Sequence, residues 1–379
     1  MTLLVGIDEA GYGPHLGPLV VAAAAMEFRG DALPDPDLWP ALAEHVHKRP
    51  AGAKGRVIIC DSKIAHAGPR GDAHLERAVL GALAAMGRRP RNLDELLATT
   101  NVANGAQGIP AGVPSSVTLS RPDGTCEGSR CGCCLSDGQQ PQPQRDSSAS
   151  LREGRNDNVL EVPPLPEPWH QPQAMALPQA TTGAEIASAA EQLRAGLGGI
   201  NGAVGGFWVN VASPARFNRL IDGGRNKAAA LFALAADLLA AVQHHRPRDP
   251  ILVTMDRHGG RRYYAEMLSA AFPMTAVETL EESPAQSRYR LQRSHAGAAV
   301  EIVVRDKCET WSLATALASM AAKYVRELHM LQLNAYFQSH VPGLRATAGY
   351  GLDAWRFLDD VAAARAAAGV PDAAILRSR

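Results

Sequence analysis

The N-terminal stretch TLLVGIDEAGYGPHLGPLVVAAAAMEF, residues 2–28, decides how the rest of the chain is interpreted. Its apolar runs at 2–8 and 17–28 are joined by a glycine-rich turn, which predicts a β-hairpin. The first strand ends on two adjacent carboxylates, Asp8 and Glu9. Successive side chains of a strand point to opposite faces, so both acids can serve one site only if the strand bends there. Gly11 and Gly13 make such a bend feasible.

Beyond residue 28, short apolar runs alternate with helical patterns, which favours an α/β fold with a mixed central β-sheet flanked by helices. We expect strands at 56–61, 206–212, 250–256, 286–293 and 298–304, the last two forming a hairpin. We expect helices at 72–86, 184–197, 226–244, 311–338 and 353–368, the first with Asp72 as its N-cap.

Length and composition limit the class of protein. A chain of 379 residues with 46% hydrophobic residues can bury a full core. Its formal net charge is zero, so a nucleic-acid partner would have to be held by local basic patches. No run matches the roughly 18 uncharged apolar residues of a membrane span, and the N-terminus has no signal-type pattern. We therefore expect a cytoplasmic monomer with no membrane partner.

The composition changes between residues 96 and 183, where Pro, Gly, Ser and Gln are frequent and large apolar residues are few. Such a segment cannot bury enough surface to offset its ordering entropy, which predicts a disordered insertion. The folded domain would then be divided into residues 1–95 and residues 184–379.

Four cysteines lie close together in this insertion: Cys126, Cys131, Cys133 and Cys134. They lack the usual paired C-x₂-C spacing of a zinc site, and two adjacent cysteines fit one ion poorly. We expect free thiols rather than structural zinc. Cys60 and Cys308 stand alone, and we expect them to pack as small apolar residues.

Several apolar strands end on acids, at Asp8–Glu9, Asp61 and Asp256, and Glu309 precedes the long helix. A single acid at a strand end usually faces solvent or caps a helix. Strand ends in open α/β sheets face the ligand crevice, however, so acids placed there together can converge. Converging carboxylates need cations to remain ionised, and Mg²⁺ or Mn²⁺ is the usual solution.

Six blocks of sequence, in order, resemble the type 2 ribonuclease H (ribonuclease HII) family. They are GIDEAGYGP with LGPLVVAAA, CDSKIA, ARFNRLIDGGRNKAAALFALAADLLAAV, PILVTMD, KCETWSLATALASMAAKYVREL and AGYGLDAWRFL. The combination of DEAG, DSK and ASMAAK in register carries most of the resemblance. It implies a ribonuclease H-like fold and an endonuclease that acts on RNA–DNA hybrid duplexes.

The resemblance also implies the catalytic residues. Asp8, Glu9 and Asp256 match metal-binding carboxylates of the family, which holds two Mg²⁺ or Mn²⁺ ions. The fourth carboxylate is either Glu309, ten residues before Ser319 as the family spacing asks, or Glu327. We favour Glu309, although it stands where the family has the shorter aspartate.

The substrate-binding residues follow from the same resemblance. The backbone of Gly11, Tyr12 and Gly13 matches the loop that approaches the ribose 2′-hydroxyl, and an ordinary hairpin turn is the alternative. Tyr350 matches a tyrosine that stacks near the ribose, or is simply a packed aromatic residue. Two lysines are candidates to contact phosphate, or are exposed and unpaired: Lys63 and Lys307.

The chain departs from the family pattern in its substrate-reading turns. Tyr12 replaces an arginine, Ala348 replaces a lysine, and the family's histidine and threonine near the second turn are absent. Lost cations weaken the grip on a duplex. Compensation could come from two basic groups, Arg257, Arg261 and Arg262 in one loop and Arg288, Arg290 and Arg293 on the predicted hairpin. The latter three would share one strand face, or merely protect a sheet edge.

The sequence therefore predicts a metal-dependent endonuclease that leaves 5′-phosphate and 3′-hydroxyl ends. The first alternative is a catalytically altered or inactive nucleic-acid-binding protein with the same fold. A second is a metal-dependent phosphohydrolase that acts on a small substrate.

Overall fold

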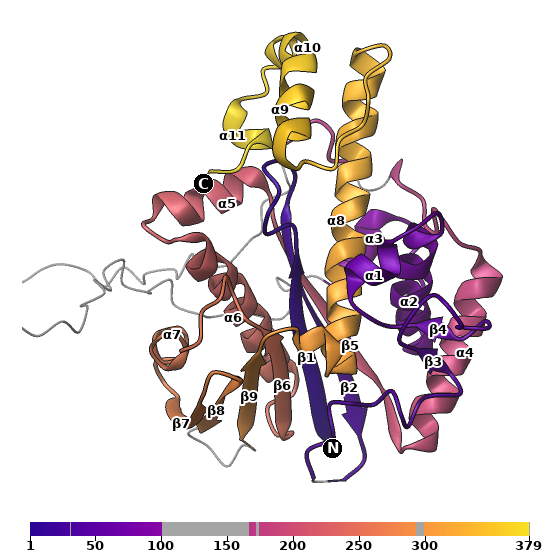
Figure 1. Ribbon diagram of the computed structural model, residues 1–379, viewed down its shortest axis with the longest axis vertical. Helices are drawn as coiled ribbons and strands as arrows, with labels where there is room; N and C mark the ends of the chain where they lie inside the picture. The colour runs from indigo at the N-terminus through magenta and orange to yellow at the C-terminus, as the bar shows by residue number, and fades with distance from the viewer. Residues whose placement is uncertain (31, 101–166, 172–173, 293–298, 379) are drawn as a thin grey trace, which may run out of the picture.

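The computed structural model describes residues 1–30, 32–100, 167–171, 174–292 and 299–378. One seven-stranded mixed sheet runs through the molecule in the order β5-β2-β1-β6-β9-β8-β7 (Figure 1). Its strands are β1 Thr2–Ala10, β2 Leu19–Phe28, β5 Gly202–Ala212, β6 Ile251–Asp256, β7 Ala276–Glu282, β8 Gln286–Gln292 and β9 Val300–Arg305. The neighbours β1, β6 and β9 are parallel, and the other pairings are antiparallel. The expected mixed α/β architecture is confirmed.

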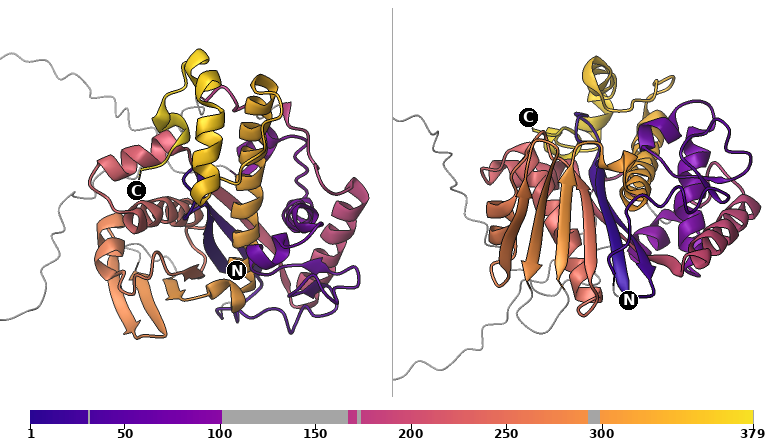
Figure 2. Two further views of the ribbon diagram at one scale, coloured as in Figure 1. Left: turned by 45° about the horizontal axis from the view of Figure 1, so that its top comes forward. Right: turned by 60° about the horizontal axis from the view of Figure 1, so that its bottom comes forward.

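Helices cover both faces of this sheet (Figures 1 and 2). On one side lie α1 Ser62–His66, α2 Gly71–Ala85, α3 Leu93–Thr100, α4 Gly183–Gly199 and the long α8 Leu313–His340, with the short strands β3 Val46–His47 and β4 Val57–Ile58. On the other side lie α5 Pro214–Asp222, α6 Lys227–His245 and α7 Ala265–Ala271. The chain ends in α9 Gly351–Asp360, α10 Ala362–Ala367 and α11 Asp372–Ile375, which gather around the second half of α8.

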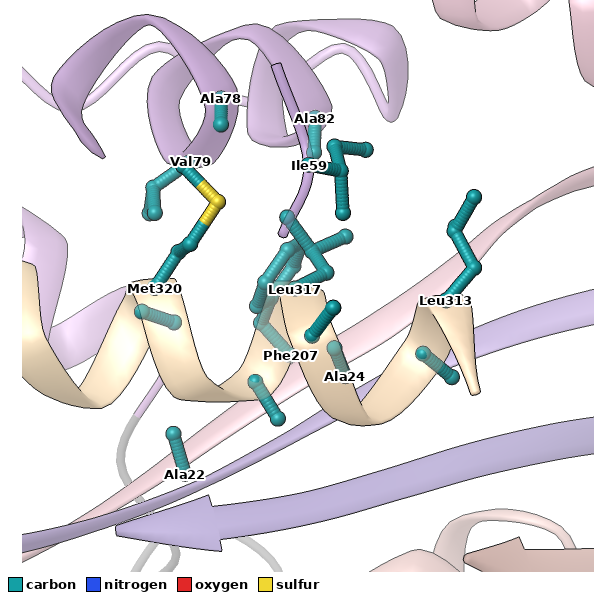
Figure 3. Packing of buried hydrophobic residues seen from close by; sticks show 14 of the residues in the cluster. Ala22, Ala24, Ile59, Ala78, Val79, Ala82, Phe207, Leu313, Leu317 and Met320 are labelled. Carbon is teal, nitrogen blue, oxygen red and sulfur yellow. The ribbon is translucent and has the colours of Figure 1, made fainter. Parts of the chain in front are cut away.

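The central strands are buried on both faces because their side chains alternate between two helix layers. In β1, Leu3, Val5 and Ile7 face the α6 side, whereas Leu4 faces α8. Leu317 and Met320 of α8 pack between small residues of β2 and the helices beyond (Figure 3). The small side chains of Ala22 and Ala24 in β2 leave room for the larger side chains of α8.

Gly6 is the point of closest approach between β1 and α8. A Cβ added there would lie 2.0 Å from the amide nitrogen of Thr315 and 2.1 Å from the carbonyl carbon of Ala314. Backbone atoms cannot swing aside as a flexible side chain can, so only glycine fits at this contact. The first turn of α8 therefore rests directly on the backbone of β1.

We predict that Gly6→Ala destabilises the protein by about 3 kcal/mol or more, because the added methyl group would force helix and sheet apart. The free energy of unfolding in urea measures this loss. Gly198→Ala is the matched control, since a Cβ there meets open space within helix α4. A Gly6→Ala variant as stable as its parent would contradict the close contact.

Two local predictions about acids are wrong. Asp72 does not cap α2, which begins at Gly71, and its carboxylate instead pairs with Nε2 of His66 at 2.9 Å. Asp61 does not end a strand of the main sheet. It caps α1 by accepting a hydrogen bond from the Lys63 amide, because β4 ends at Ile58 in a separate two-stranded sheet.

Other predicted elements are found with shifted ends. The hairpin of β8 and β9 is present, but a third strand, β7, pairs with β8 on its other side. The long helix starts at Leu313 because Ser312 caps it, and the predicted helix at 353–368 is interrupted at Val361. By length and composition α6 is apolar enough to cross a membrane, yet it packs against the sheet with ten buried residues.

The low-complexity segment begins and ends within ordered structure. Helix α3 continues to Thr100, past the predicted boundary at residue 96. Asn92 and Ala176 form an isolated antiparallel bridge, and buried Glu76 accepts hydrogen bonds from the amides of 179, 180 and 181. The four clustered cysteines lie outside the described residues. Cys60 and Cys308 are buried free thiols, as expected.

A small cavity of about 20 Å³ lies beside the second half of α8, where β2 begins and β5 ends. His329 lines it, with Nδ1 on the carbonyl of Val325 and Nε2 without a partner. Its ring stacks on His170, and Glu167 faces the same space. Burial, with the nearby charges of His170 and Arg326, lowers the pKa of His329 to about 4, so the imidazole is neutral in the folded protein.

We predict that His329 makes the protein less stable in mild acid. The unfolded chain gains a proton on this residue below pH 6.5, whereas the folded one does so only near pH 4, so stability is lost between these values. Between pH 7.5 and pH 5 the parent should lose about 2 kcal/mol more than His329→Gln. Urea unfolding at both pH values tests this, with exposed His340→Gln as control. Parallel pH curves for parent and His329→Gln would contradict it.

Candidate active site

Three adjacent parallel strands bring acids to one edge of the sheet. β1 ends with Asp8 and Glu9, β6 ends on Asp256, and β9 runs into Asp306 and then Glu309 of a 3₁₀ turn, Cys308–Thr310. Because the strands are parallel, all these carboxylates lie at their carboxyl ends, where open α/β sheets bind ligands.

Asp8 is 9% exposed and lies on the α8 side of the sheet. Its pKa is raised well above the usual value, first by burial and then by the charge of Glu9, and a hydrogen bond from Ser319 opposes the rise. The Ser319 hydroxyl also bonds the Ser62 hydroxyl at 3.0 Å. The DSK and ASMAAK blocks therefore meet behind Asp8, and Ser319 orients its carboxylate.

Strand alternation alone would place Glu9 on the opposite face from Asp8, yet the two carboxyl groups lie within hydrogen-bond reach of one another. Burial and the charge of Asp256 raise its pKa to about 7, while Lys63 works against this rise. The predicted bend is not seen in the pairing with β2, which continues without a break to Ala10. Instead β1 and β6 stop pairing after Ile7 and Met255. The next residues in register, Asp8 and Asp256, are therefore level with each other, and Glu9 lies one residue past the end of β6.

Asp256 is held by backbone amides at the end of β6. Its Oδ1 accepts from the Arg257 amide at 2.9 Å, and the amides of Cys308 and Lys307 also favour its charged form. Burial nevertheless raises its pKa, and the charge of Asp306 adds to this effect. Lys307 has a left-handed backbone with φ of 53°, which turns its amide toward the site.

The two candidates for the fourth carboxylate occupy different surroundings. Burial and the charges of Asp256 and Asp61 raise the pKa of Glu309, and its Oε2 is buried without a hydrogen-bond partner. Glu327 is instead neutralised by Lys323 at 2.6 Å and by Arg326 at 3.2 Å. An acid already paired with two cations has little charge to offer a metal ion, so the geometry favours Glu309.

The donor set fits a hard divalent cation such as Mg²⁺ or Mn²⁺. It consists of carboxylates that repel one another, and Glu309 retains an oxygen with no partner. As the side chains stand, no three His, Cys, Asp or Glu residues in the described ranges form a finished metal cage.

The glycine-rich turn after β1 is packed against the protein at Gly11 and exposed to solvent at Gly13. Gly11 has φ of 91°, and a Cβ there would lie 2.5 Å from the carbonyl oxygen of Pro18 and 2.8 Å from Nε of Arg326. A Cβ on Gly13 would lie 3.8 Å from the ring of Tyr350. Tyr350 is 48% exposed, so it is not a core aromatic, and its ring borders the turn.

Arg326 fastens the two turns together from inside the protein. Its Nη2 donates to the carbonyl of Leu16 at 3.4 Å and to that of Ala348 at 3.0 Å, and its guanidinium lies 5.6 Å from the Tyr350 ring centroid. This fully buried residue was not singled out in the sequence. The one sequence feature that could have pointed to Arg326 is the Arg–acid pair, Arg326 and Glu327, that follows ASMAAK.

The candidate phosphate contacts are less uniform than the acids. Lys63 is exposed at the start of α1, and its charge is felt by both Glu9 and Glu309. Lys307 is exposed too, and its backbone amide donates a hydrogen bond that favours the charged form of Asp256. Tyr12 is half-buried beside Glu9, whose charge adds to burial in raising the pKa of its phenol.

The hairpin arginines do not supply a free basic face. Arg288 and Arg290 do share a face of β8, but they form ion pairs with Glu301 at 3.2 and 2.9 Å, and Arg290 also pairs with Glu278. β8 is an interior strand because β7 covers it, so the edge-protection alternative is wrong as well. Arg293 lies outside the described residues.

Sequence reasoning missed three residues that act on the acids. Ser319 and Ser62 lie behind Asp8, and the charge of Asp306 raises the pKa of Asp256. The two serines lie inside blocks that carried the family resemblance, so their position was a usable signal. Asp306 had none beyond being an acid close to Glu309.

We predict a double signature for Asp8→Asn. In EDTA the variant should be more stable than the parent by roughly 1 kcal/mol, because a buried charge beside Glu9 and Asp256 is removed. Saturating Mn²⁺ should raise the melting temperature of the parent, by an amount equivalent to about 2.7 kcal/mol at 100 times the dissociation constant, and leave the variant nearly unchanged. Thermal melts at pH 7.5 test both. Equal Mn²⁺ shifts in the two proteins would exclude Asp8 as a ligand.

Comparison with known proteins gives structural likeness only. No protein-family model matches the sequence, and no curated protein matches it. The chain is similar to RNase HII in the PCNA:RNase HII complex from Archaeoglobus fulgidus, with 13% identity and a TM-score of 0.39 over 100% of this chain and 94% of that one. It is also similar to ribonuclease H2 from Pyrococcus horikoshii OT3, with 11% identity and a TM-score of 0.39 over 99% and 92%. A third similar structure is Bst-RNase HIII in complex with Mn²⁺, with 14% identity and a TM-score of 0.36 over 99% of this chain and 66% of that one.

Proposed function

We propose that this chain is a divalent-metal-dependent endonuclease that hydrolyses RNA, or single embedded ribonucleotides, within RNA–DNA hybrid duplexes. The observation that carries the proposal is that Asp8, Glu9, Asp256 and Glu309 follow the carboxyl ends of three adjacent parallel strands, where the charges of neighbouring acids raise the pKa of Asp8, Glu9 and Glu309. An arrangement with so much buried negative charge is costly unless cations are bound there.

Two Mg²⁺ or Mn²⁺ ions bound by these four residues would supply Lewis-acid chemistry, activating water and stabilising the leaving oxygen. The chain's own contribution is to hold the carboxylates. Ser319 fixes Asp8, and the amides of Arg257, Lys307 and Cys308 fix Asp256. The exposed backbone of Gly13 leaves room for a ribose to approach the turn, and the exposed face of Tyr350 borders the same turn.

In this reaction a water oxygen bonds to phosphorus and the bond from phosphorus to the 3′-oxygen breaks. One product keeps a 5′-phosphate, and the other takes a proton on its 3′-oxygen. No histidine base is needed in this scheme. His258 lies in the buried layer behind Asp256, and burial lowers its pKa to about 3, so it remains neutral. We further propose that the protein acts as a monomer in the cytoplasm.

One rival function has specific support. The replacement of turn cations by Tyr12 and Ala348, together with a glutamate at 309, would suit a nucleic-acid-binding protein that retained the fold and lost cleavage. An added methylene at residue 309 can displace a metal by about 1 Å, and errors of that size can cost about 10²-fold in rate.

A cleavage assay separates the two. An end-labelled duplex with one ribonucleotide is incubated with the protein and Mg²⁺ or Mn²⁺, beside an Asp256→Asn control. We expect metal-dependent cleavage at the ribonucleotide by the parent and a loss of at least 10²-fold in the control. Binding without cleavage at any salt concentration would favour the rival. Equal cleavage of an all-DNA duplex would remove the selectivity for ribonucleotides.

A further inference from the structure

The loop between β6 and α7 has a charge pattern that the four-acid site does not explain. It has the sequence RHGGRRY, residues 257–263, and we refer to it as the basic loop. It leaves β6 directly after Asp256 and contains three arginines, Arg257, Arg261 and Arg262. Gly259 and Gly260, with φ of 58° and 79°, turn the loop sharply, and both are exposed.

The three arginines have no acidic partner in the described part of the chain. Nε of Arg257 and Nε of Arg261 are buried without hydrogen-bond partners, and Nη2 of Arg257 donates to the carbonyl of Pro284 at 2.7 Å. Arg262 is exposed. The nearby hairpin shows the contrast, because Arg288 and Arg290 are each matched by a glutamate. The basic loop is therefore a local excess of positive charge in a protein of zero formal net charge.

Tyr12 links the basic loop to the acids. A Cβ built on Gly259 would lie 2.7 Å from the Tyr12 hydroxyl, so the phenol reaches the loop backbone. Tyr12 also lies close enough to Glu9 for its phenol to feel that charge. The loop consequently lies beside the acids and is supported by the very residue that replaces the expected arginine.

The surroundings of the loop add to its positive potential and offer an aromatic surface. The start of α6 approaches Gly259, where a Cβ would lie 3.4 Å from Ala228, and a helix N-terminus carries partial positive charge. Tyr263, at the end of the loop, is 62% exposed. Arginines beside an exposed aromatic ring are the combination with which proteins hold phosphates and stack on bases.

We propose that the basic loop binds backbone phosphates of the nucleic-acid strand next to the four-acid site, through Arg261 and Arg262, and that Tyr12 is a positioning residue which supports the loop. The loop then replaces the cation missing from the glycine-rich turn. This deepens the proposed function by naming the contact that holds its substrate. Because the loop proposal concerns binding, binding experiments can test it separately from cleavage.

The test is duplex binding in EDTA, where hydrolysis cannot occur. Fluorescence anisotropy gives the affinity for an RNA–DNA hybrid and for an all-DNA duplex between 50 and 200 mM salt. Each lost phosphate contact lowers the slope of log affinity against log salt by about 0.9 on B-form DNA, so Arg261→Ala/Arg262→Ala should lower it by about 1.8. Over this salt range the parent then loses about 12-fold more affinity than the double variant. The control, Arg89→Ala/Arg248→Ala, removes the same charge at exposed positions outside the site and should keep the parental slope.

Tyr12→Ala tests the supporting role. Alone it should lower the salt slope, and in the Arg261→Ala/Arg262→Ala background it should have no further effect, because it acts through the loop. Additive losses would show that Tyr12 contacts nucleic acid itself and would overturn its positioning role. An unchanged slope in Arg261→Ala/Arg262→Ala, an equal fall in the control, or no duplex binding by the parent would overturn the loop proposal. Failure to cleave, with the slopes as predicted, would overturn only the proposed function.

Discussion

The contact between the backbone of β1 at Gly6 and the first turn of α8 sets the position of everything around the acids. Two residues along a strand advance about 6.6 Å, from Gly6 to Asp8. Four to five residues along a helix advance about 6 to 7.5 Å, from Ala314 and Thr315 to Ser319. The distance along β1 from Gly6 to Asp8 thus matches the distance along α8 from the contact point to Ser319. The Ser319 hydroxyl consequently lies beside the Asp8 carboxylate. The same turn of α8 holds β6, because Thr254 bonds the hydroxyls of Ser312 and Thr315 at 2.8 Å.

This rigidity matters because the acids oppose one another. Burial and mutual repulsion raise the pKa of Asp8 and Glu9, so the folded chain stores unfavourable electrostatic energy at the sheet edge. A flexible support would let the carboxylates separate and relax. The close helix–strand contact prevents this on one side, and backbone amides fix Asp256 on the other. The fold thus maintains a charge arrangement that is favourable only with cations present.

The parts of the fold that the sequence predicted are those specified by local pattern. Apolar runs located β1, β2, β6, β8 and β9, and their terminal acids located Asp8, Glu9 and Asp256. β7, with the sequence AVETLEE, was not predicted because three of its seven residues are acidic and its strand form depends on pairing with β8. Asp61 and Asp72 were misassigned because capping depends on where the preceding backbone ends, which a composition pattern does not fix.

Side-chain partnerships were the least predictable part. The roles of Arg326, Arg288 and Arg290 depend on residues distant in sequence, such as Leu16 for the first and Glu301 for the other two. A run of arginines looks the same in sequence whether it is neutralised or free. Only the fold distinguishes the paired arginines of β8 from those of residues 257–262.

The bridge between Asn92 and Ala176 has a consequence for how this protein can change over time. It joins the two described stretches that flank residues 101–166, and Glu76 secures the second stretch by accepting hydrogen bonds from the amides of 179–181. Loop-closure entropy grows only with the logarithm of length, so doubling the length of chain between two joined stretches costs about 0.6 kcal/mol. The length of the segment between Thr100 and Glu167 therefore has little effect on the free energy of folding. Insertions, deletions or whole foreign modules could be exchanged there while the sheet and its acids stay as they are.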